Sequence, residues 1–131
     1  MTLTRPILIV EDDPVTRQTF RDILVAGGYG VEVAADAESG LAAIGVRPPA
    51  AVLLDLRLPL ADGLEFLRRL RATASHASIP VAIVTGDYLI DEPLAKALNG
   101  HGAQIYFKPL WEDDLLRVVG RLLSSSHPTS H

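Results

Sequence analysis

The stretch ILIVEDDP, residues 7–14, carries the strongest fold signal in the chain. Residues 7–10 are apolar without any polar alternation, which is typical of a strand buried on both faces of a parallel sheet. An acidic turn follows at residues 11–13, and Pro14 suits the first turn of a helix, where its missing N–H is not needed. The stretch therefore predicts a buried strand that passes through a short acidic turn into a helix.

Strands and helices are predicted to alternate in the same way along the whole chain. Further strands are expected at residues 30–35, 51–54, 79–84 and 105–107. Helices are expected at residues 14–27, 36–47, 91–100 and 111–123, and a further helix after the loop at residues 57–63, with apolar positions at residues 64, 66, 67 and 70. Such alternation implies parallel strands joined by right-handed crossovers. We expect an α/β fold with a doubly wound five-stranded parallel sheet, flavodoxin-like order 2-1-3-4-5, and five helices. One domain should cover residues 1–123, followed by a flexible tail over residues 124–131.

The composition excludes several classes of protein. The chain has 131 residues and a net charge of −4, with 48% hydrophobic and 21% charged residues, so disorder of the whole chain is excluded. Apart from Arg68, Arg69 and Arg71, which we interpret as the exposed face of a helix, the basic residues are scattered, so we expect no direct nucleic-acid binding. The absence of cysteine excludes disulfides and thiolate sites. No apolar stretch approaches the ~20 residues that cross a bilayer, so we expect a cytoplasmic protein without membrane contact.

The residues that follow the strands are the candidate site, because ligands on an open parallel sheet bind beyond the carboxyl ends of its strands. Glu11, Asp12 and Asp13 follow the first strand and Asp55 follows the third. Thr85 follows the fourth strand, and Lys108 with Pro109 follows the fifth. In the predicted order these four strands are neighbours, so carboxylates, a hydroxyl and an ammonium group should converge.

Each of these residues has a plain explanation when taken alone. The acidic triplet could simply stabilise the start of a helix, Thr85 could belong to a turn, and Lys108 could belong to a common Lys-Pro loop. Asp55 is harder to explain in this way, because it directly follows four buried apolar residues. Clustered carboxylates would repel one another without a cation, and Mg²⁺ suits oxygen ligands and phosphate, whereas zinc is disfavoured without Cys or His at the strand ends. A hard cation beside a nucleophilic carboxylate is typical of aspartyl phosphate formation.

These motifs, with LLDLRLP at residues 53–59, Asp62-Gly63 and IVTG at residues 83–86, resemble the receiver domain of two-component response regulators over about residues 5–123. The resemblance implies that Asp55 takes a phosphoryl group from a histidine kinase or a histidine phosphotransfer domain in a Mg²⁺-dependent reaction. The domain would then switch conformation to relay the signal. It would be a regulatory module and not an enzyme with external substrates.

The resemblance also assigns roles to the other site residues. Asp12 would bind Mg²⁺ directly, Glu11 would act through water, and the backbone carbonyl of Arg57 would complete the protein's share of the metal ligands. Thr85 and Lys108 would contact phosphoryl oxygens, and the Lys108–Pro109 bond is expected to be cis. A homodimer through the fourth helix, fifth strand and fifth helix is a further expectation.

Three features bear on how closely the chain follows this family. The family commonly carries an aromatic switch residue three positions before the lysine, where this chain has Ile105 and not Tyr106. We favour a receiver without the usual switch over an altered strand register. No output domain follows, so a single-domain regulator and a receiver from a hybrid histidine kinase both fit. Arg57 and Asp87 occupy positions that adjust dephosphorylation in this family, although a plain surface role fits both almost as well.

The sequence disfavours three alternative functions. A Mg²⁺-dependent phosphatase with an aspartate nucleophile would want an acid two residues later, where this chain has Arg57. A nucleotide- or flavin-binding domain is disfavoured because no glycine-rich loop follows the first strand. A degenerate docking module is disfavoured by the intact set of acidic, hydroxyl and lysine residues.

Overall fold

A five-stranded parallel sheet forms the centre of the computed structural model, which describes residues 5–59, 62–87 and 89–125. The strands lie in the order β2-β1-β3-β4-β5, which confirms the predicted doubly wound α/β fold. Their bounds are β1 Ile7–Val10, β2 Val31–Ala34, β3 Ala51–Leu54, β4 Val81–Thr85 and β5 Ala103–Phe107. The point where strand order reverses therefore lies between β1 and β3.

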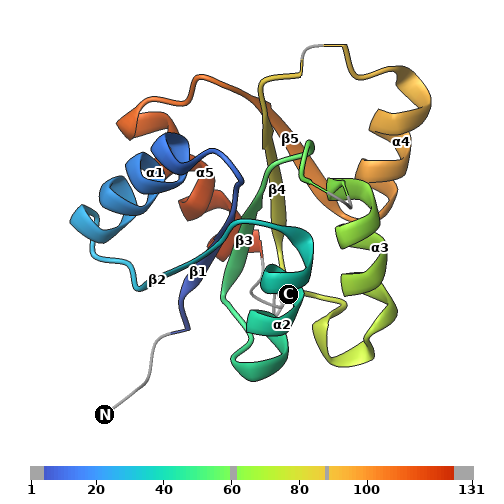
Figure 1. Ribbon diagram of the computed structural model, residues 1–131, viewed down its shortest axis with the longest axis horizontal. Coiled ribbons are helices and arrows are strands. Elements are labelled where there is room, and N and C mark those ends of the chain that lie inside the picture. The colour runs from blue at the N-terminus through green and yellow to red at the C-terminus, as the bar shows by residue number, and fades with distance from the viewer. Residues whose placement is uncertain (1–4, 60–61, 88, 126–131) are drawn as a thin grey trace.

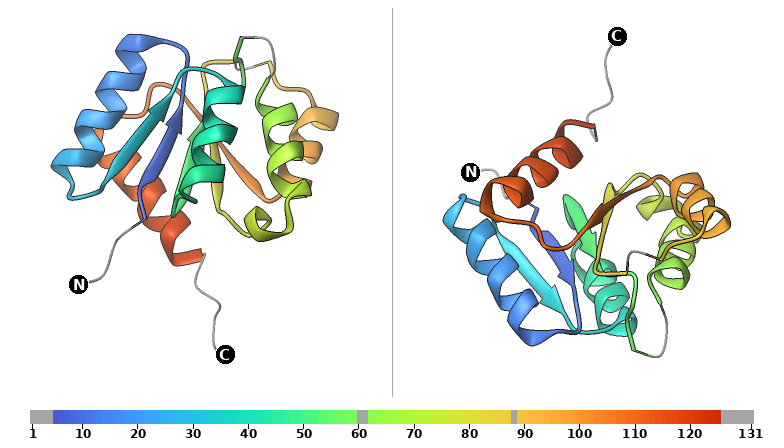
Figure 2. Two further views of the ribbon diagram at one scale, coloured as in Figure 1. Left: turned by 60° about the horizontal axis from the view of Figure 1, so that its bottom comes forward. Right: turned by 90° about the horizontal axis from the view of Figure 1, so that it is seen from above.

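Five α-helices cover the two faces of this sheet. They are α1 Pro14–Ala26, α2 Ala37–Val46, α3 Gly63–Ala72, α4 Glu92–Gly100 and α5 Glu112–Ser125, with a 3₁₀ turn at Ala74–His76. Helices α1 and α5 cover one face, and α2, α3 and α4 cover the other (Figure 1). The same two layers can be followed from two further directions in Figure 2.

The central strands are buried on both faces, as their unbroken apolar runs predict. In β1, Leu8 and Val10 pack into the core under α2, α3 and α4, whereas Ile7 and Ile9 pack into the core under α1 and α5. This division follows from the two-residue period of a strand, which points successive side chains to opposite faces. The residues that follow β1 and β3 are therefore attached to strands that pack into both cores.

An aspartate lies immediately before the first residue of each of the helices α1, α2, α3 and α4. The side chains of Asp13, Asp36, Asp62 and Asp91 accept hydrogen bonds from backbone N–H groups three residues later. This is the N-cap arrangement, which satisfies an otherwise unpaired donor in the first helical turn. The structure thus confirms Asp13 as a helix-start residue and Asp91 as the N-cap of α4.

Some boundaries differ from the predicted ones. Strand β5 begins at Ala103, two residues earlier than predicted, and β4 begins at Val81, two residues later than predicted. Thr85 is the last residue of β4 because it pairs with Phe107. Helix α5 runs to Ser125, two residues past the predicted domain boundary, while residues 126–131 of the predicted tail lie outside the described residues.

The predicted exposed face of α3 needs a correction at one arginine. Arg68 and Arg69 are exposed, but Arg71 is half-buried. Its guanidinium donates hydrogen bonds to the carbonyl oxygens of His101 and Ile79, both at 2.7 Å. Arg71 therefore ties the end of α3 to the segments that flank α4 and β4.

Candidate functional site

Three carboxylates meet at the carboxyl edge of the sheet. Glu11, Asp12 and Asp55 each offer one oxygen atom, and these atoms all lie within 4.8 Å of one another. The backbone explains the meeting, because β1 and β3 pair in register and the Asp55 N–H donates to the carbonyl oxygen of Val10 at 3.0 Å. The parallel ladder thus continues one residue past both strands and places Glu11 and Asp55 side by side.

The three carboxylates differ in their exposure to solvent. Glu11 and Asp55 are only 2% and 8% exposed, whereas Asp12 is exposed. Burial raises the pKa of Glu11, and the nearby Asp55 carboxylate also raises it, while hydrogen bonds from Lys108 and from the Asp13 N–H oppose the rise. Buried negative charge of this kind is costly unless cations compensate it.

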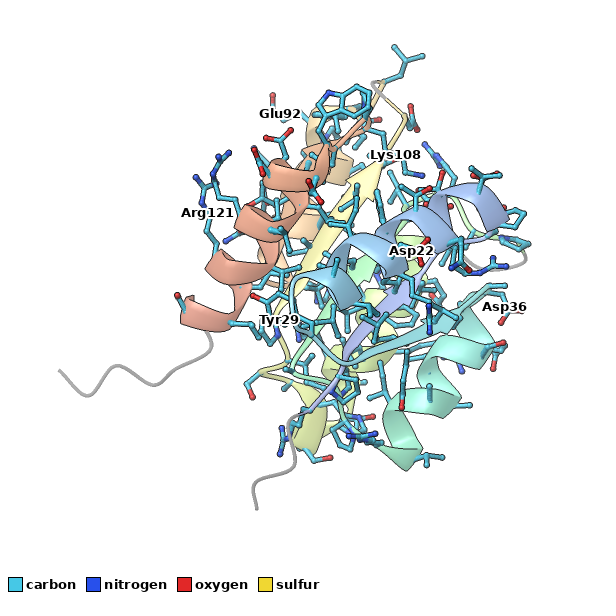
Figure 3. All side chains as sticks on the ribbon, turned by 90° about the vertical axis from the view of Figure 1, so that its left-hand side faces the viewer. Asp22, Tyr29, Asp36, Glu92, Lys108 and Arg121 are labelled. Atoms are coloured by element: carbon cyan, nitrogen blue, oxygen red, sulfur yellow. The ribbon has the colours of Figure 1, made fainter. Side chains whose placement is uncertain are left out.

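Lys108 supplies one such cation. Its Nζ atom lies 2.5 Å from Glu11 Oε1 and 3.7 Å from Asp55 Oδ2. The residue follows β5 directly, and its N–H donates to the carbonyl oxygen of Thr85 at 2.8 Å, which aims the side chain across the ends of the strands. Figure 3 shows Lys108 at this end of the molecule, close to the start of α1. The Lys108–Pro109 bond is cis, as expected.

One ammonium group balances only part of the charge of three carboxylates. The donor set consists of carboxylate oxygens from two adjacent strand ends, one of them reachable from solvent. Hard divalent cations prefer oxygen donors of this kind. The residues present therefore fit such a cation.

Thr85 completes the set of residues predicted for the site. It is fully buried at the end of β4, next to β3, and its hydroxyl oxygen accepts a hydrogen bond from the Asp87 N–H at 3.0 Å. The structure therefore brings the side chains of Glu11, Asp12, Asp55 and Lys108 together, with Thr85 on the neighbouring strand.

The loop after β3 lies close against the start of α3. The Gly63 N–H donates to the carbonyl oxygen of Leu56 at 2.8 Å, and a Cβ atom at Gly63 would come within 2.9 Å of the Asp55 carbonyl oxygen. Only glycine allows this approach without displacing backbone. The Arg57 N–H, in the same loop, lies 3.4 Å from Asp55 Oδ1.

Two further contacts at the site are not predicted by the sequence. Arg17 of α1 donates to the backbone carbonyl oxygens of Glu11 at 2.9 Å and Asp12 at 3.3 Å, and so fixes the acidic turn. Arg57 pairs with Asp87 across the ends of β3 and β4, with its Nε atom 2.8 Å from Asp87 Oδ2. The only sequence signal for the first contact is a basic residue one turn into a helix that follows acidic residues.

The residues before Lys108 are placed as the strand period predicts. Ile105 packs against the core under α2, α3 and α4, whereas Tyr106 packs against the core under α1 and α5. Regular pairing of β4 with β5 shows that the register is not shifted. The position three residues before Lys108 therefore carries an aliphatic side chain.

Comparisons with known proteins agree with this geometry. The model of the response regulator receiver domain family matches residues 7–120. Response regulator MprA from Mycobacterium sp. (strain KMS) is 37% identical over 123 residues, which cover 93% of this chain and 52% of that protein. MprA from Mycobacterium avium (strain 104) is 36% identical with the same coverage. The chain thus spans about half the length of these curated relatives.

Solved structures give the same result. A CheY-like response regulator receiver domain protein from Methanospirillum hungatei JF-1 has a TM-score of 0.86 and 30% identity, with coverage of 95% of this chain and 97% of that chain. The receiver domain of NtrX from Brucella abortus has a TM-score of 0.81 and 34% identity, with coverage of 91% and 98%. Within the described part of the chain, no helix has the length and apolar character needed to cross a membrane. The chain belongs to the family of response regulator receiver domains, the phosphoacceptor modules of two-component signalling.

Proposed function

We propose that Asp55 is the residue that accepts the phosphoryl group, and that Glu11 and Asp12 hold Mg²⁺ beside it. The observation that carries this proposal is the position of Asp55 in the cluster. Its carboxylate lies within 4.8 Å of the Glu11 and Asp12 oxygens and 3.7 Å from the Lys108 ammonium group. An acceptor in this place has a metal-binding pair on one side and a fixed cation on another.

The roles of the two acidic residues follow from their present partners. Glu11 already accepts hydrogen bonds from Lys108 Nζ at 2.5 Å and from the Asp13 N–H at 3.1 Å, so it suits a contact through water. Asp12 is exposed and suits direct coordination, with the backbone carbonyl of Arg57 as a further ligand. Mg²⁺ typically binds through one or two carboxylates, several waters and phosphate oxygens. When bound, it supplies neutralisation of the charge on the phosphoryl oxygens during transfer.

The chain's own residues perform the remaining steps. A carboxylate oxygen of Asp55 attacks phosphorus in line and forms the O–P bond as the P–N bond to the donor histidine breaks. Lys108 neutralises one phosphoryl oxygen and the Thr85 hydroxyl donates to another. The product adds nearly two negative charges at a largely buried site, and this change drives the conformational switch.

The proposed partner is a histidine kinase or a histidine phosphotransfer domain, and the domain acts as a regulatory module in the cytoplasm. The donor must reach Asp55 from the carboxyl edge of the sheet. Two exposed apolar side chains, Val15 and Trp111, line a hollow of about 260 Å³ beside Lys108 at this edge, and they offer a surface for that partner. A homodimer through α4, β5 and α5 is a separate proposal, which sedimentation before and after phosphorylation would test.

Mass measurement of the intact protein tests the proposal directly. The protein is incubated with acetyl phosphate and either Mg²⁺ or EDTA, and the product is then treated with hydroxylamine, which cleaves acyl phosphates. We expect a single phosphoryl adduct that needs Mg²⁺ and is lost in hydroxylamine. Absence of the adduct with Mg²⁺ present, or an adduct that survives hydroxylamine, would contradict the assignment.

A further inference from the structure

An ion pair connects the loop after β3 with the loop after β4. The Arg57 guanidinium donates through Nε to Asp87 Oδ2 at 2.8 Å, and its Nη2 atom contacts the same oxygen. The backbone N–H of Arg57 lies 3.4 Å from Asp55 Oδ1, so the same residue also adjoins the acceptor carboxylate. Arg57 therefore stands between the acceptor and the loop after β4.

Asp87 extends this connection in two directions. Its backbone N–H donates to the Thr85 hydroxyl oxygen at 3.0 Å, and its second carboxylate oxygen accepts from the Leu89 N–H at 2.9 Å. The bonds from Leu89 and then from Arg57 lower the pKa of Asp87, so the side chain is anionic at neutral pH. Contacts thus run without interruption from Asp55 through Arg57 and Asp87 to both Thr85 and Leu89.

The two partners of the ion pair are unequally exposed. The side chain of Arg57 is 59% exposed, whereas that of Asp87 is 19% exposed. A solvent-exposed guanidinium loses little when it leaves a surface ion pair. Arg57 is therefore free to exchange Asp87 for a stronger anion within its reach.

We propose that Arg57 is a phosphoryl-positioning residue. Its guanidinium pairs with Asp87 in the unphosphorylated protein and moves to the phosphoryl group when Asp55 is phosphorylated. The inference rests on the proposed role of Asp55 as acceptor. Phosphorylation places nearly two negative charges and three strong acceptor oxygens only two residues from Arg57. Arginine binds phosphate through several parallel N–H donors, more strongly than it binds one carboxylate oxygen.

The other cations at the site are engaged differently. Lys108 bonds to Glu11, and Arg17 bonds to the backbone carbonyls of Glu11 and Asp12, so both already belong to the acidic cluster. Arg57 is paired instead with an aspartate outside that cluster. Its departure would leave Asp87 without its cation and would loosen the Leu89 N–H contact, two residues before the N-cap Asp91 of α4. A charge added at Asp55 would in this way change the segment that enters α4.

Nuclear magnetic resonance of the Arg57 Nε–H group reports its partner directly. In the unphosphorylated protein, Asp87→Ala should shift the Arg57 Nε–H resonance away from its wild-type position. After phosphorylation with acetyl phosphate and Mg²⁺, we expect that resonance to move in the wild type and to coincide in the wild type and Asp87→Ala, because the partner is then the phosphoryl group in both. The Leu89 amide of the phosphorylated wild type should approach its position in unphosphorylated Arg57→Ala.

A matched control removes a similar ion pair elsewhere. Arg69 of α3 pairs with Glu38 of α2, with Nη1 and Oε2 2.5 Å apart, and the two residues are also far apart in sequence. Arg69→Ala should leave the Arg57 and Leu89 resonances unchanged in both states. An Arg57 resonance that keeps its wild-type position in fully phosphorylated protein would overturn this inference alone, whereas the absence of any adduct by mass would overturn the proposed role of Asp55.

Discussion

At the scale of single residues, three carboxylates and one ammonium group meet in the site, with Lys108 Nζ 2.5 Å from Glu11 Oε1 and 3.7 Å from Asp55 Oδ2. Glu11, Asp55 and Lys108 could be predicted because each directly follows a strand whose apolar run is easy to recognise. Their meeting then follows from strand order alone. The Arg57–Asp87 pair could not be predicted, because it depends on the conformations of two long side chains in loops 30 residues apart.

Replacement of the acceptor should separate its chemical role from its effect on stability. Asp55→Asn should abolish the phosphoryl adduct while it raises the free energy of unfolding by about 1 kcal/mol in EDTA, because a neutral amide relieves repulsion among buried carboxylates. Intact mass and chemical denaturation measure the two effects. Persistent labelling of this variant would place the acceptor elsewhere, and a large loss of stability would show that the Asp55 charge holds the fold together.

The raised pKa of Glu11 predicts a specific dependence of stability on pH. The folded protein holds the Glu11 proton more tightly than the unfolded chain, whose glutamate titrates near the ordinary value of 4.5. Stability from this group is therefore fully present below about pH 4.5 and is lost as the pH rises through the higher pKa of the folded state. In EDTA, Glu11→Gln should remove this loss. The thermal midpoint of the variant minus that of the wild type should therefore increase as the pH is raised from acidic to neutral. A constant difference between the two proteins across this range would contradict the prediction.

At the scale of elements, the bounds of β1 and β3 were predictable, whereas those of β4 and β5 were less so. The start of β4 was placed two residues too early, because Ile79 and Pro80 precede its first paired residue, Val81. The bounds of β1 and β3 match their apolar runs to the residue. Strand β5 lies at the edge of the sheet and begins with Ala103 and the exposed Gln104, so no apolar pattern marks its first two residues. Only the pairing with β4 defines where β5 starts.

The start of α3 makes a prediction about packing. A Cβ atom at Gly63 would lie 2.9 Å from the Asp55 carbonyl oxygen and 3.0 Å from the Leu56 Cα atom. Both are backbone atoms, so no side-chain rotation can relieve the clash. Gly63→Ala should therefore lower the free energy of unfolding by about 1–3 kcal/mol and slow phosphorylation, because the loop that carries Asp55 must shift.

Gly45 in α2 provides the matched control, since a Cβ atom there would meet nothing within 4 Å. Gly45→Ala should raise the free energy of unfolding by up to about 1 kcal/mol, in line with the helix propensities of the two residues, and leave phosphorylation unchanged. Chemical denaturation of both variants measures the two changes in the free energy of unfolding. Equal effects at the two positions would show that the close approach at Gly63 is not constraining.

At the scale of the whole molecule, the strict alternation of strands and helices made the topology predictable. Parallel strands with right-handed crossovers leave few arrangements, and the reversal of strand order after β1 fixes which strand ends meet. Two hydrophobic layers pack against the sheet, and β1, β3 and β4 are buried along their whole length. The acidic residues and Thr85 thus lie at the ends of the most buried strands, whereas Lys108 comes from the edge strand β5.

Because Mg²⁺ should bind only the folded site, it should stabilise the entire domain. The expected gain is ~2.7 kcal/mol at a free Mg²⁺ concentration roughly 100 times the dissociation constant, and it should appear as a higher thermal midpoint. Asp12→Ala should lose this gain, because it removes the proposed direct ligand. Asp13→Asn is the matched control: Asp13 caps α1 through Thr16, and asparagine caps helices equally well, so this variant should keep the full response. If Asp13→Asn lost the response while Asp12→Ala kept it, the metal ligand would be Asp13, and the acidic turn would have to be reassigned by one residue.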